Sequence, residues 1–191
     1  TDSDIHGIKA IRECDNISLK DCSVTSEEFG WKCENIHLSN TTIRSEYLFL
    51  DSKNVTLENV RMSGKYSFQY MENLEIRNSD LNTKDAFWHA ENVTVRDSVV
   101  RGEYLAWYSK GLTLERCTII GTQPLCYCED LTLIDCEMID TDLSFERSHV
   151  NATLRAPIHS IKNPTSGTIR VPAVGEIILD DENAHGQIVV G

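Results

Sequence analysis

Asn54-Val55-Thr56-Leu57 returns 19 residues later as Asn73-Leu74-Glu75-Ile76, and after another 19 residues as Asn92-Val93-Thr94-Val95. The equivalent positions of the other units are Asn16, Asn35, Gly111, Asp130 and His149. A fixed period of a few tens of residues is typical of solenoid proteins, in which each unit stacks on its neighbours. The spacing therefore predicts a repeat architecture.

Each unit begins with alternating apolar and polar residues, as in Val55, Thr56 and Leu57. This alternation is typical of a short strand with one buried face. We call the Asn, or its equivalent, that begins each unit the anchor. Five positions after the anchor stands a residue that is usually Asn or Asp, such as Asn59. Asn and Asp suit a turn because their side chains can form hydrogen bonds with nearby backbone. A second apolar pair follows, such as Val60 and Met62, and predicts a second short strand after this corner.

A third segment, rich in aromatic residues, precedes the next anchor, as in 84–89 and 103–108. We predict a third short strand there, so that each turn has three faces. Equivalent residues would then stack at the strand spacing of about 4.8 Å, and the Asn column could form a ladder of side-chain amides. The expected fold is an all-β parallel β-helix with about 19 residues and three short strands per turn.

The period weakens toward the carboxyl end, where Pro157, Pro164 and Pro172 interrupt it. We expect residues 1–140 to form regular turns and residues 141–191 to form irregular turns and a cap of the same domain. Anchors at 149, 168 and 187 keep the spacing of 19, and the alternation beside the last two predicts continuing strands. At the other end no cap is visible before the first regular unit, which favours a chain trimmed from a longer one.

The composition indicates one acidic domain. The 191 residues contain 30 Asp and Glu against 18 Lys and Arg, which gives a net charge of −12 and a pI near 4.9. Nucleic acid demands a basic surface, so it is not an expected partner. No apolar run approaches the roughly 18 residues of a membrane span, so no membrane partner is expected either.

The seven cysteines are interpreted as small buried thiols, because several recur in inward slots that hold Ser, Thr or Val in other units. Cys126-Tyr127-Cys128 is a weak zinc signal, since no second pair or nearby His completes it. The histidines are dispersed. We expect no metal and no cofactor. Unpaired thiols favour a reducing compartment such as the cytoplasm, although the localisation is otherwise open.

The aromatic segment is the candidate site. Trp residues share one column of the repeat, Tyr and His share the next, and Asp85 interrupts a third column of Tyr. Adjacent columns of a strand alternate in direction, so at least one would face solvent, and exposed rings with polar tips suit sugar rings. The predicted ligand-binding residues are Trp31, Tyr70, Asp85, Trp88, His89, Trp107, Tyr108 and Tyr127. The alternative is that Phe49, Phe68 and Phe87 stack internally while the Tyr and Trp residues only shield that edge.

No catalytic residues are predicted. A glycosidase needs two carboxylates flanking the scissile bond, and Asp51 and Asp85 would lie roughly 10 Å apart, near the outer limit for an inverting enzyme. A lyase of the β-helix type would need a carboxylate cluster for calcium and a base, and no such cluster is present. Enzymatic activity is left open, with a non-enzymatic role favoured.

Three stretches, at 84–95, 103–113 and 160–169, together with Glu176-Ile177-Ile178-Leu179-Asp180-Asp181, make the chain resemble a bacterial family, the domain of unknown function numbered 3737. The resemblance spans nearly the whole chain. It implies a right-handed parallel β-helix of the pectate-lyase-like class, usually with several more turns upstream. It implies no established activity and no catalytic residues.

The function expected from these observations is a non-enzymatic module that binds carbohydrate or another extended ligand on the aromatic face. Two alternatives stay open, namely a polysaccharide-active lyase or hydrolase and a structural rod that docks a protein partner. The oligomeric state is also open.

Overall fold

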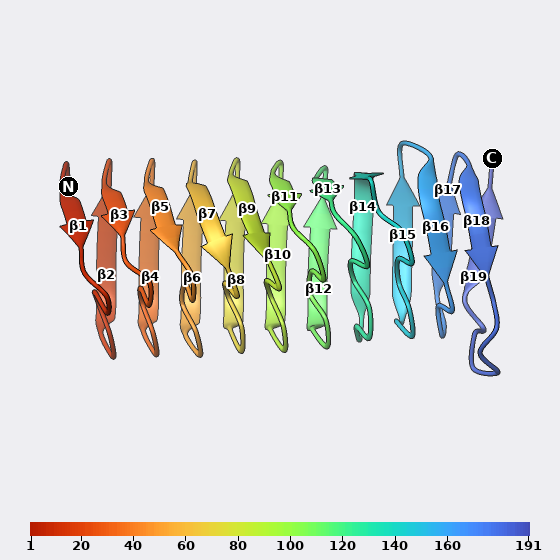
Figure 1. The fold of residues 1–191 in the computed structure, drawn as a ribbon, viewed down its shortest axis with the longest axis horizontal. Coiled ribbons are helices and arrows are strands. Elements are labelled where there is room, and N and C mark those ends of the chain that lie inside the picture. Colours follow the sequence, from red (N-terminus) through yellow and green to blue (C-terminus); the bar gives the residue numbers. More distant parts are fainter.

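The computed structural model describes residues 1–191 and contains strands but no helix. The strands stack in parallel as a β-solenoid of about 10 turns, which confirms the fold expected from the repeat (Figure 1). In Figure 1 the nearer strands run downward and the more distant ones upward while the chain advances from N to C, so the coil is right-handed. The structure has no helix that is long and apolar enough to cross a membrane.

The first face of the solenoid carries the strand that opens each turn. Its members are β2 (Asp15–Lys20), β4 (Glu34–Ser39), β6 (Lys53–Glu58), β8 (Glu72–Arg77), β10 (Glu91–Arg96), β12 (Lys110–Glu115), the first part of β14 (Leu131–Ile139), β15 (Val150–Leu154), β17 (Thr168–Val171) and β19 (Gln187–Val190). Neighbours in the regular turns pair with an offset of 19, as in Val55 with Leu74 and Val93 with Leu112.

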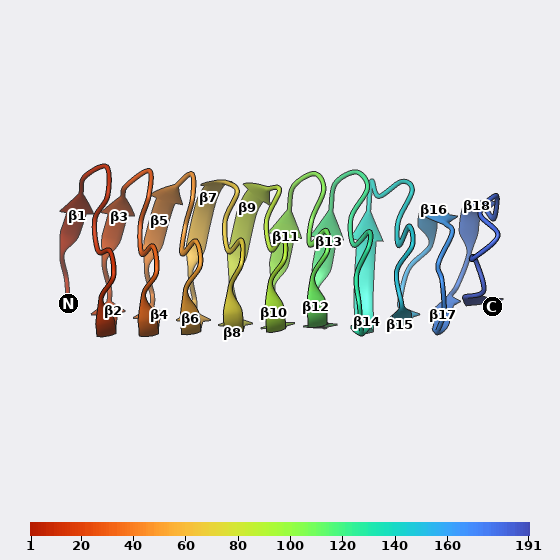
Figure 2. The same ribbon diagram turned by 90° about the horizontal axis from the view of Figure 1, so that it is seen from below.

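The second face carries the strand that follows the corner. Its members are β1 (Asp4–His6), β3 (Ser23–Thr25), β5 (Thr42–Ser45), β7 (Arg61–Lys65), β9 (Asp80–Lys84), β11 (Val99–Arg101), β13 (Thr118–Ile120) and the second part of β14. Two further strands, β16 (Ile158–Lys162) and β18 (Val174–Ile178), pair with each other in a separate small sheet. Seen from below in Figure 2, the two faces lie on opposite sides of the coil.

Asparagine fixes both bends of a turn. The anchor Asn54 and the corner residue Asn59 each have a φ of +54°, a left-handed conformation that Asn tolerates better than most residues. The predicted amide ladder is present along the anchors, because Asn54 Nδ2 donates to Asn35 Oδ1 at 3.1 Å and Asn73 Nδ2 donates to Asn54 Oδ1 at 3.0 Å. A second ladder joins corner residues, with Asn59 Nδ2 donating to Asn40 Oδ1 at 3.1 Å.

The third face differs from the expected third strand. Its segment is a turn in which every second residue has positive φ, with +52° at Asp85, +62° at Phe87 and +55° at His89. Its backbone N–H groups still donate hydrogen bonds to neighbouring turns, alternately to the preceding turn and to the following one. Phe87 N donates back to Ser67 O and Asp85 N donates forward to Glu103 O, both at 2.9 Å. Alternating left-handed residues cannot form an extended strand, so only two strands occur in each regular turn.

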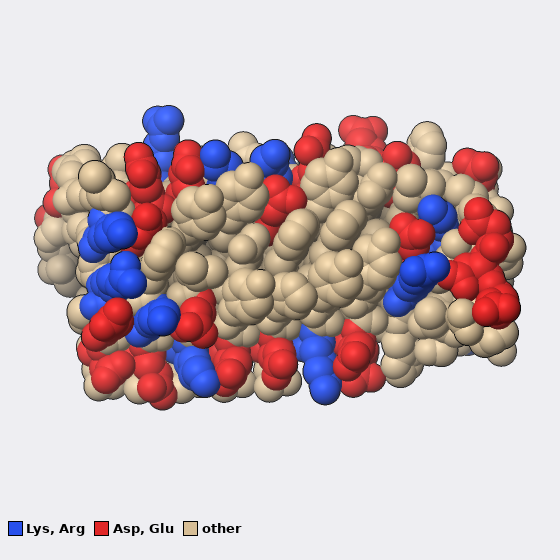
Figure 3. Space-filling view, turned by 60° about the horizontal axis from the view of Figure 1, so that its bottom comes forward, with Lys and Arg blue, Asp and Glu red and all other residues tan.

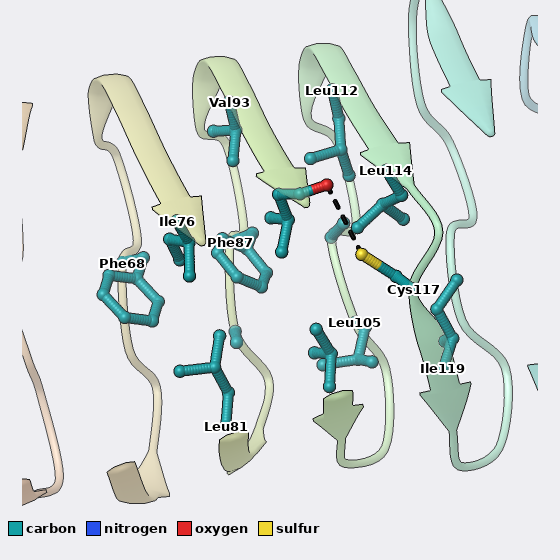
Figure 4. Close-up of a cluster of buried hydrophobic side chains, with 14 of the residues drawn as sticks. Phe68, Ile76, Leu81, Phe87, Val93, Leu105, Leu112, Leu114, Cys117 and Ile119 are labelled. Carbon is teal, nitrogen blue, oxygen red and sulfur yellow. Dashed lines mark hydrogen bonds between the residues drawn. The ribbon is translucent and has the colours of Figure 1, made fainter. Parts of the chain in front are cut away.

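The core runs along the axis as stacked columns of apolar side chains. Phe68 and Phe87 are fully or almost fully buried and stack with ring centroids 5.1 Å apart (Figure 4). Cys117 occupies an inward slot and its Sγ donates to Val95 O at 3.4 Å. Six of the seven thiols are buried and all seven are free, as the sequence predicts.

The last turns shorten the repeat. Leu131 pairs with Val150, which keeps the offset of 19, but His149 lies opposite Ser166 and Ala152 lies opposite Ile169. The anchor predicted at 168 is therefore displaced by two residues, because this coil is 17 residues long. The predicted continuing strands are nevertheless present as β17 and β19, which pair in parallel.

Candidate functional site

A strip of aromatic side chains covers the outside of the third face. We call these rings the aromatic strip. Its members are Trp31, Tyr47, Tyr66, Tyr70, Trp88, His89, Tyr104, Trp107, Tyr108 and Tyr127. Figure 3 shows a broad area without charged atoms along the middle of the molecule, with acidic and basic atoms gathered around its borders.

One column of the strip is a continuous stack of four rings. The centroids of Tyr70 and His89 lie 5.0 Å apart, those of His89 and Tyr108 lie 5.1 Å apart, and those of Tyr108 and Tyr127 lie 4.9 Å apart. The interplanar angles do not exceed 12°. Tyr70 is 53% exposed and Tyr108 is 49% exposed. Because each inner ring is covered on both faces by its neighbours, the stack offers solvent mainly ring edges and polar tips.

In the neighbouring column, the Trp side chains donate hydrogen bonds to backbone carbonyls of the following turn. Trp88 Nε1 donates to Tyr104 O at 2.6 Å, and Trp107 Nε1 donates to Gln123 O at 2.8 Å. Trp31 Nε1 makes the equivalent bond to Tyr47 O, at 2.7 Å. Each indole N–H group thus bonds to a backbone carbonyl, which would otherwise lack a donor. The indole N–H groups are therefore not free to bind a ligand.

Gln69 occupies the same column as the Trp residues and makes the same contact. Its Nε2 donates to Asp85 O at 2.9 Å. The amide oxygen Oε1 makes no hydrogen bond within the protein, and the side chain is partly exposed. Gln69 therefore adds one free acceptor to the surface between the rings.

Asp85 replaces a tyrosine in the third column, which Glu28 precedes at the amino-terminal end. Tyr47 and Tyr66 stack at 5.1 Å in that column, and Tyr104 continues it beyond Asp85. Asp85 is only 8% exposed, and its nearest cation is Lys84 Nζ, at 3.9 Å. Burial raises the pKa of the Asp85 carboxyl, while Lys84 lowers it and Glu103 raises it by smaller amounts. Its carboxylate oxygens accept no hydrogen bond from the protein.

Ion pairs border the strip on its long sides. Lys65 Nζ lies 3.3 Å from Glu46, and Lys53 Nζ lies 2.9 Å from Glu72. At the amino-terminal end, Trp31 lies beneath the Arg12 guanidinium, 5.3 Å from the ring centroid. At the carboxyl-terminal end, beyond Tyr127, the Arg147 guanidinium lies 2.8 Å from the Asp181 carboxylate. The rim therefore offers few unpartnered cations.

The structure brings the eight sequence-predicted residues onto one face. Trp88, His89, Trp107, Tyr108 and Tyr127 lie close together, whereas Trp31 lies at the amino-terminal end, separated from Trp88 by Leu50 and Gln69 in its own column. The expectation that adjacent columns alternate in direction is wrong here, because the positive φ values turn both 88 and 89 outward.

Tyr47, Tyr66, Tyr104 and Gln69 also belong to this surface but are not among the predicted residues. The signal for the three tyrosines is their shared slot in the repeat, immediately beside Asp85. The signal for Gln69 is its position in the Trp column. Nothing in the sequence reports that Gln69 and the Trp residues make the same hydrogen bond to the following turn.

Other cavities and clusters offer less chemistry. One hollow, of about 640 Å³, lies at the amino-terminal side and is lined by polar side chains that include Arg44 and Glu46. No three His, Cys, Asp or Glu side chains lie together as metal ligands would. Burial raises the pKa of Cys126 to about 12 and that of Cys128 to about 11, so these thiols are poor nucleophiles.

The sequence profile of a family described as "Protein of unknown function (DUF3737)" matches residues 1–190. A search of curated proteins found no match. Among solved structures, the catalytic domain of GH87 alpha-1,3-glucanase in complex with nigerose is similar at 10% identity and a TM-score of 0.34. That match covers 92% of this chain and 54% of the glucanase chain, so this chain spans about half the length of that one.

Proposed function

Since the chain belongs to the DUF3737 family, a family of unknown function, we propose a role from its own surface: it is a module that binds an extended carbohydrate along the aromatic strip. The observation that carries this proposal is the stack of Tyr70, His89, Tyr108 and Tyr127 on four consecutive turns, in which Tyr70 and Tyr108 are each about half exposed.

The repeat of the stack supports an extended ligand. Each turn places the same type of side chain one strand spacing further along the axis, so the surface offers the same contacts repeatedly. A sugar chain is also periodic, and it presents apolar ring edges together with hydroxyl groups. Tyrosine provides apolar area and a hydroxyl that can both donate and accept. A ligand lying along the axis would meet one such group per turn.

A polysaccharide hydrolase is a second candidate, and burial of Asp85 is the observation in its favour. A raised pKa suits a general acid, which must hold a proton until it protonates the leaving group. A glycosidase needs a second carboxylate across the bond, however, and the carboxylates Glu28 and Asp51 of the ring columns lie on turns nearer the amino terminus and pair with Lys9 and Lys32. Binding without cleavage is therefore the better-supported activity.

The test is a titration of intrinsic tryptophan fluorescence with oligosaccharides of different linkage, both neutral and acidic, followed by an assay for new reducing ends. We expect a saturable change for at least one neutral oligosaccharide and no cleavage. New reducing ends would favour the hydrolase. A flat response to every sugar would contradict the proposal and direct attention to a protein partner.

Variants of the exposed tyrosines place the site. Tyr108→Ser removes a ring that makes no hydrogen bond within the protein, so it should leave the fold intact and weaken binding about tenfold, or about 1.4 kcal/mol. Ile177→Ser is the matched control, because Ile177 is 45% exposed but lies on β18, away from the strip. Equal affinities for the two variants would place the ligand elsewhere.

A further inference from the structure

We propose that the aromatic strip selects uncharged sugar chains over uronic-acid chains, and that Asp85 supplies both a hydroxyl acceptor and a charge filter. This inference rests on the proposed function and names the class of ligand that the same surface would take. It follows from three observations: the absence of Lys and Arg among the rings of the strip, the partnered cations around it, and the Asp85 carboxylate within it, which accepts no hydrogen bond from the protein.

The polar groups that the strip leaves free include no lysine ammonium and no arginine guanidinium. They are the hydroxyls of all six tyrosines, the His89 imidazole and Gln69 Oε1, while the indole N–H groups are already bonded to backbone. Hydroxyls and amide oxygens suit the hydroxyl groups of a neutral sugar. A uronate carboxylate is instead matched by an ammonium or a bidentate guanidinium, and leaving it without one is unfavourable.

Cations do lie at the border, but carboxylates already occupy them. Lys32 lies 4.0 Å from Asp51, and Lys65 lies 3.3 Å from Glu46. Arg12, which covers the Trp31 ring, lies 3.2 Å from Glu13. A uronate would have to compete with these partners in a chain whose net charge is −12. Electrostatics therefore disfavours a polyanion at both short and long range.

Asp85 is the carboxylate that stands in a tyrosine position of the strip. It is 8% exposed, Lys84 Nζ lies 3.9 Å away, and no protein donor reaches its carboxylate oxygens. The Asp85 side chain keeps 11% exposure, so water reaches it, and a hydroxyl of the ligand can replace that water as a donor. A sugar hydroxyl can donate to this carboxylate, whereas an ionised uronate cannot donate and would be repelled. The same group thus attracts one ligand class and rejects the other.

The experiment compares ligands that differ only in charge. The probes are hexagalacturonate against its methyl ester, and a C6-oxidised cellohexaose against cellohexaose, each measured by calorimetry at about 50 and about 500 mM NaCl. In at least one pair we expect the neutral member to bind about tenfold more tightly or better, with an affinity that salt changes less than about twofold.

Asp85→Asn tests the role of the carboxylate, and Asp97→Asn is the matched control because Asp97 is exposed, pairs with Arg116 and lies at the corner between the first two faces. Asp85→Asn should weaken the neutral ligand and reduce its advantage over the acidic one, while Asp97→Asn should leave both unchanged. An unaltered preference in Asp85→Asn would overturn the role assigned to Asp85.

Different results would contradict the selectivity and the carbohydrate binding itself. Tighter binding of an acidic member, or binding that salt abolishes, would overturn the selectivity but leave carbohydrate binding standing. Absence of binding by both members of both pairs, repeated with the neutral oligosaccharides of the fluorescence panel, would overturn the proposed function and the selectivity with it.

Discussion

At the residue scale, the left-handed residues decide where the chain can bend. Asn54 has a φ of +54° and Gly111, in the same column, has a φ of +66°. Glycine enters this region at no steric cost, and Asn enters it more readily than other residues. The anchor column is therefore polar for a conformational reason as well as for the amide ladder.

Asn54→Ala separates these two reasons when it is compared with Asn54→Gly. Both variants lose the amide bonds to Asn35 and Asn73, but only Ala is strained at positive φ. We expect Ala to be about 1 kcal/mol less stable than Gly, as measured by urea denaturation followed by circular dichroism. If the two variants unfold at the same urea concentration, the conformational explanation of the column is wrong.

Trp88→Phe tests the structural role of the indole group. The variant keeps an aromatic ring but removes the N–H that donates to Tyr104 O at 2.6 Å. Loss of this bond should lower the free energy of unfolding by about 1 kcal/mol. His89→Phe, one position along, is the control, since the His89 side chain makes no hydrogen bond within the protein. A Trp88→Phe variant as stable as the control would show that the bond adds nothing to the fold.

Asp85→Asn should change stability in a pH-dependent way. Burial raises the pKa of the Asp85 carboxyl above its ordinary value of 3.8, so the folded protein holds this proton more strongly than the unfolded chain. Asp85 therefore lowers stability as pH rises from 3.8 through the raised value. We expect Asp85→Asn to be more stable than the parent at neutral pH and to lose this advantage below pH 3.8. Urea midpoints across that range measure the effect, and a difference that is constant with pH would contradict it.

At the scale of elements, the sequence predicts strands better than turns. The strands β6 and β8 follow directly from the alternation beside Asn54 and Asn73, and their pairing follows from the period. The aromatic segment could not be assigned in the same way, because alternating apolar residues are compatible with an extended strand. What excludes a strand is the conformation of residues such as Phe87, whose positive φ is stabilised by bonds to both neighbouring turns and has no signature in residue type.

The candidate site, too, could be predicted from the sequence only in part. Which residues share a column could be read from the period, and this places Trp88 beside Trp107 and Tyr108 beside Tyr127. Which columns face solvent could not be read from it, because that depends on backbone conformation. The low exposure of Asp85 was also beyond reach, since the same slot holds partly exposed tyrosines in other turns.

Gly64 in β7 tests how closely two turns approach each other. A Cβ at this position would lie 1.6 Å from Ser45 O in the adjacent strand β5, so the backbones would have to separate. Gly64→Ala should destabilise the protein by about 1–3 kcal/mol. Ser63→Ala, an exposed neighbour on the same strand, should be nearly neutral. Equal urea midpoints for the two variants would contradict this close approach.

At the scale of the whole molecule, the closed core predicts how the thiols react. Cys14 is the only cysteine that is not buried, and burial raises the pKa of Cys33 and of others farther along the axis. In the native protein we expect a thiol reagent such as an aromatic disulfide to modify one thiol quickly, and in denaturant to modify all seven. Rapid modification of several thiols without denaturant would show that the core opens more readily than its packing indicates.

The alternating backbone of the third face also determines how the surface can change in size. Two neighbouring residues, Trp88 and His89, project to the same side, and Trp107 and Tyr108 of the next turn add another such pair one strand spacing along the axis. Insertion or loss of a single 19-residue unit would lengthen or shorten this face by one step and leave the remaining contacts as they are. The length of ligand that the protein can hold is thus counted in turns, and duplication of a unit is enough to alter it.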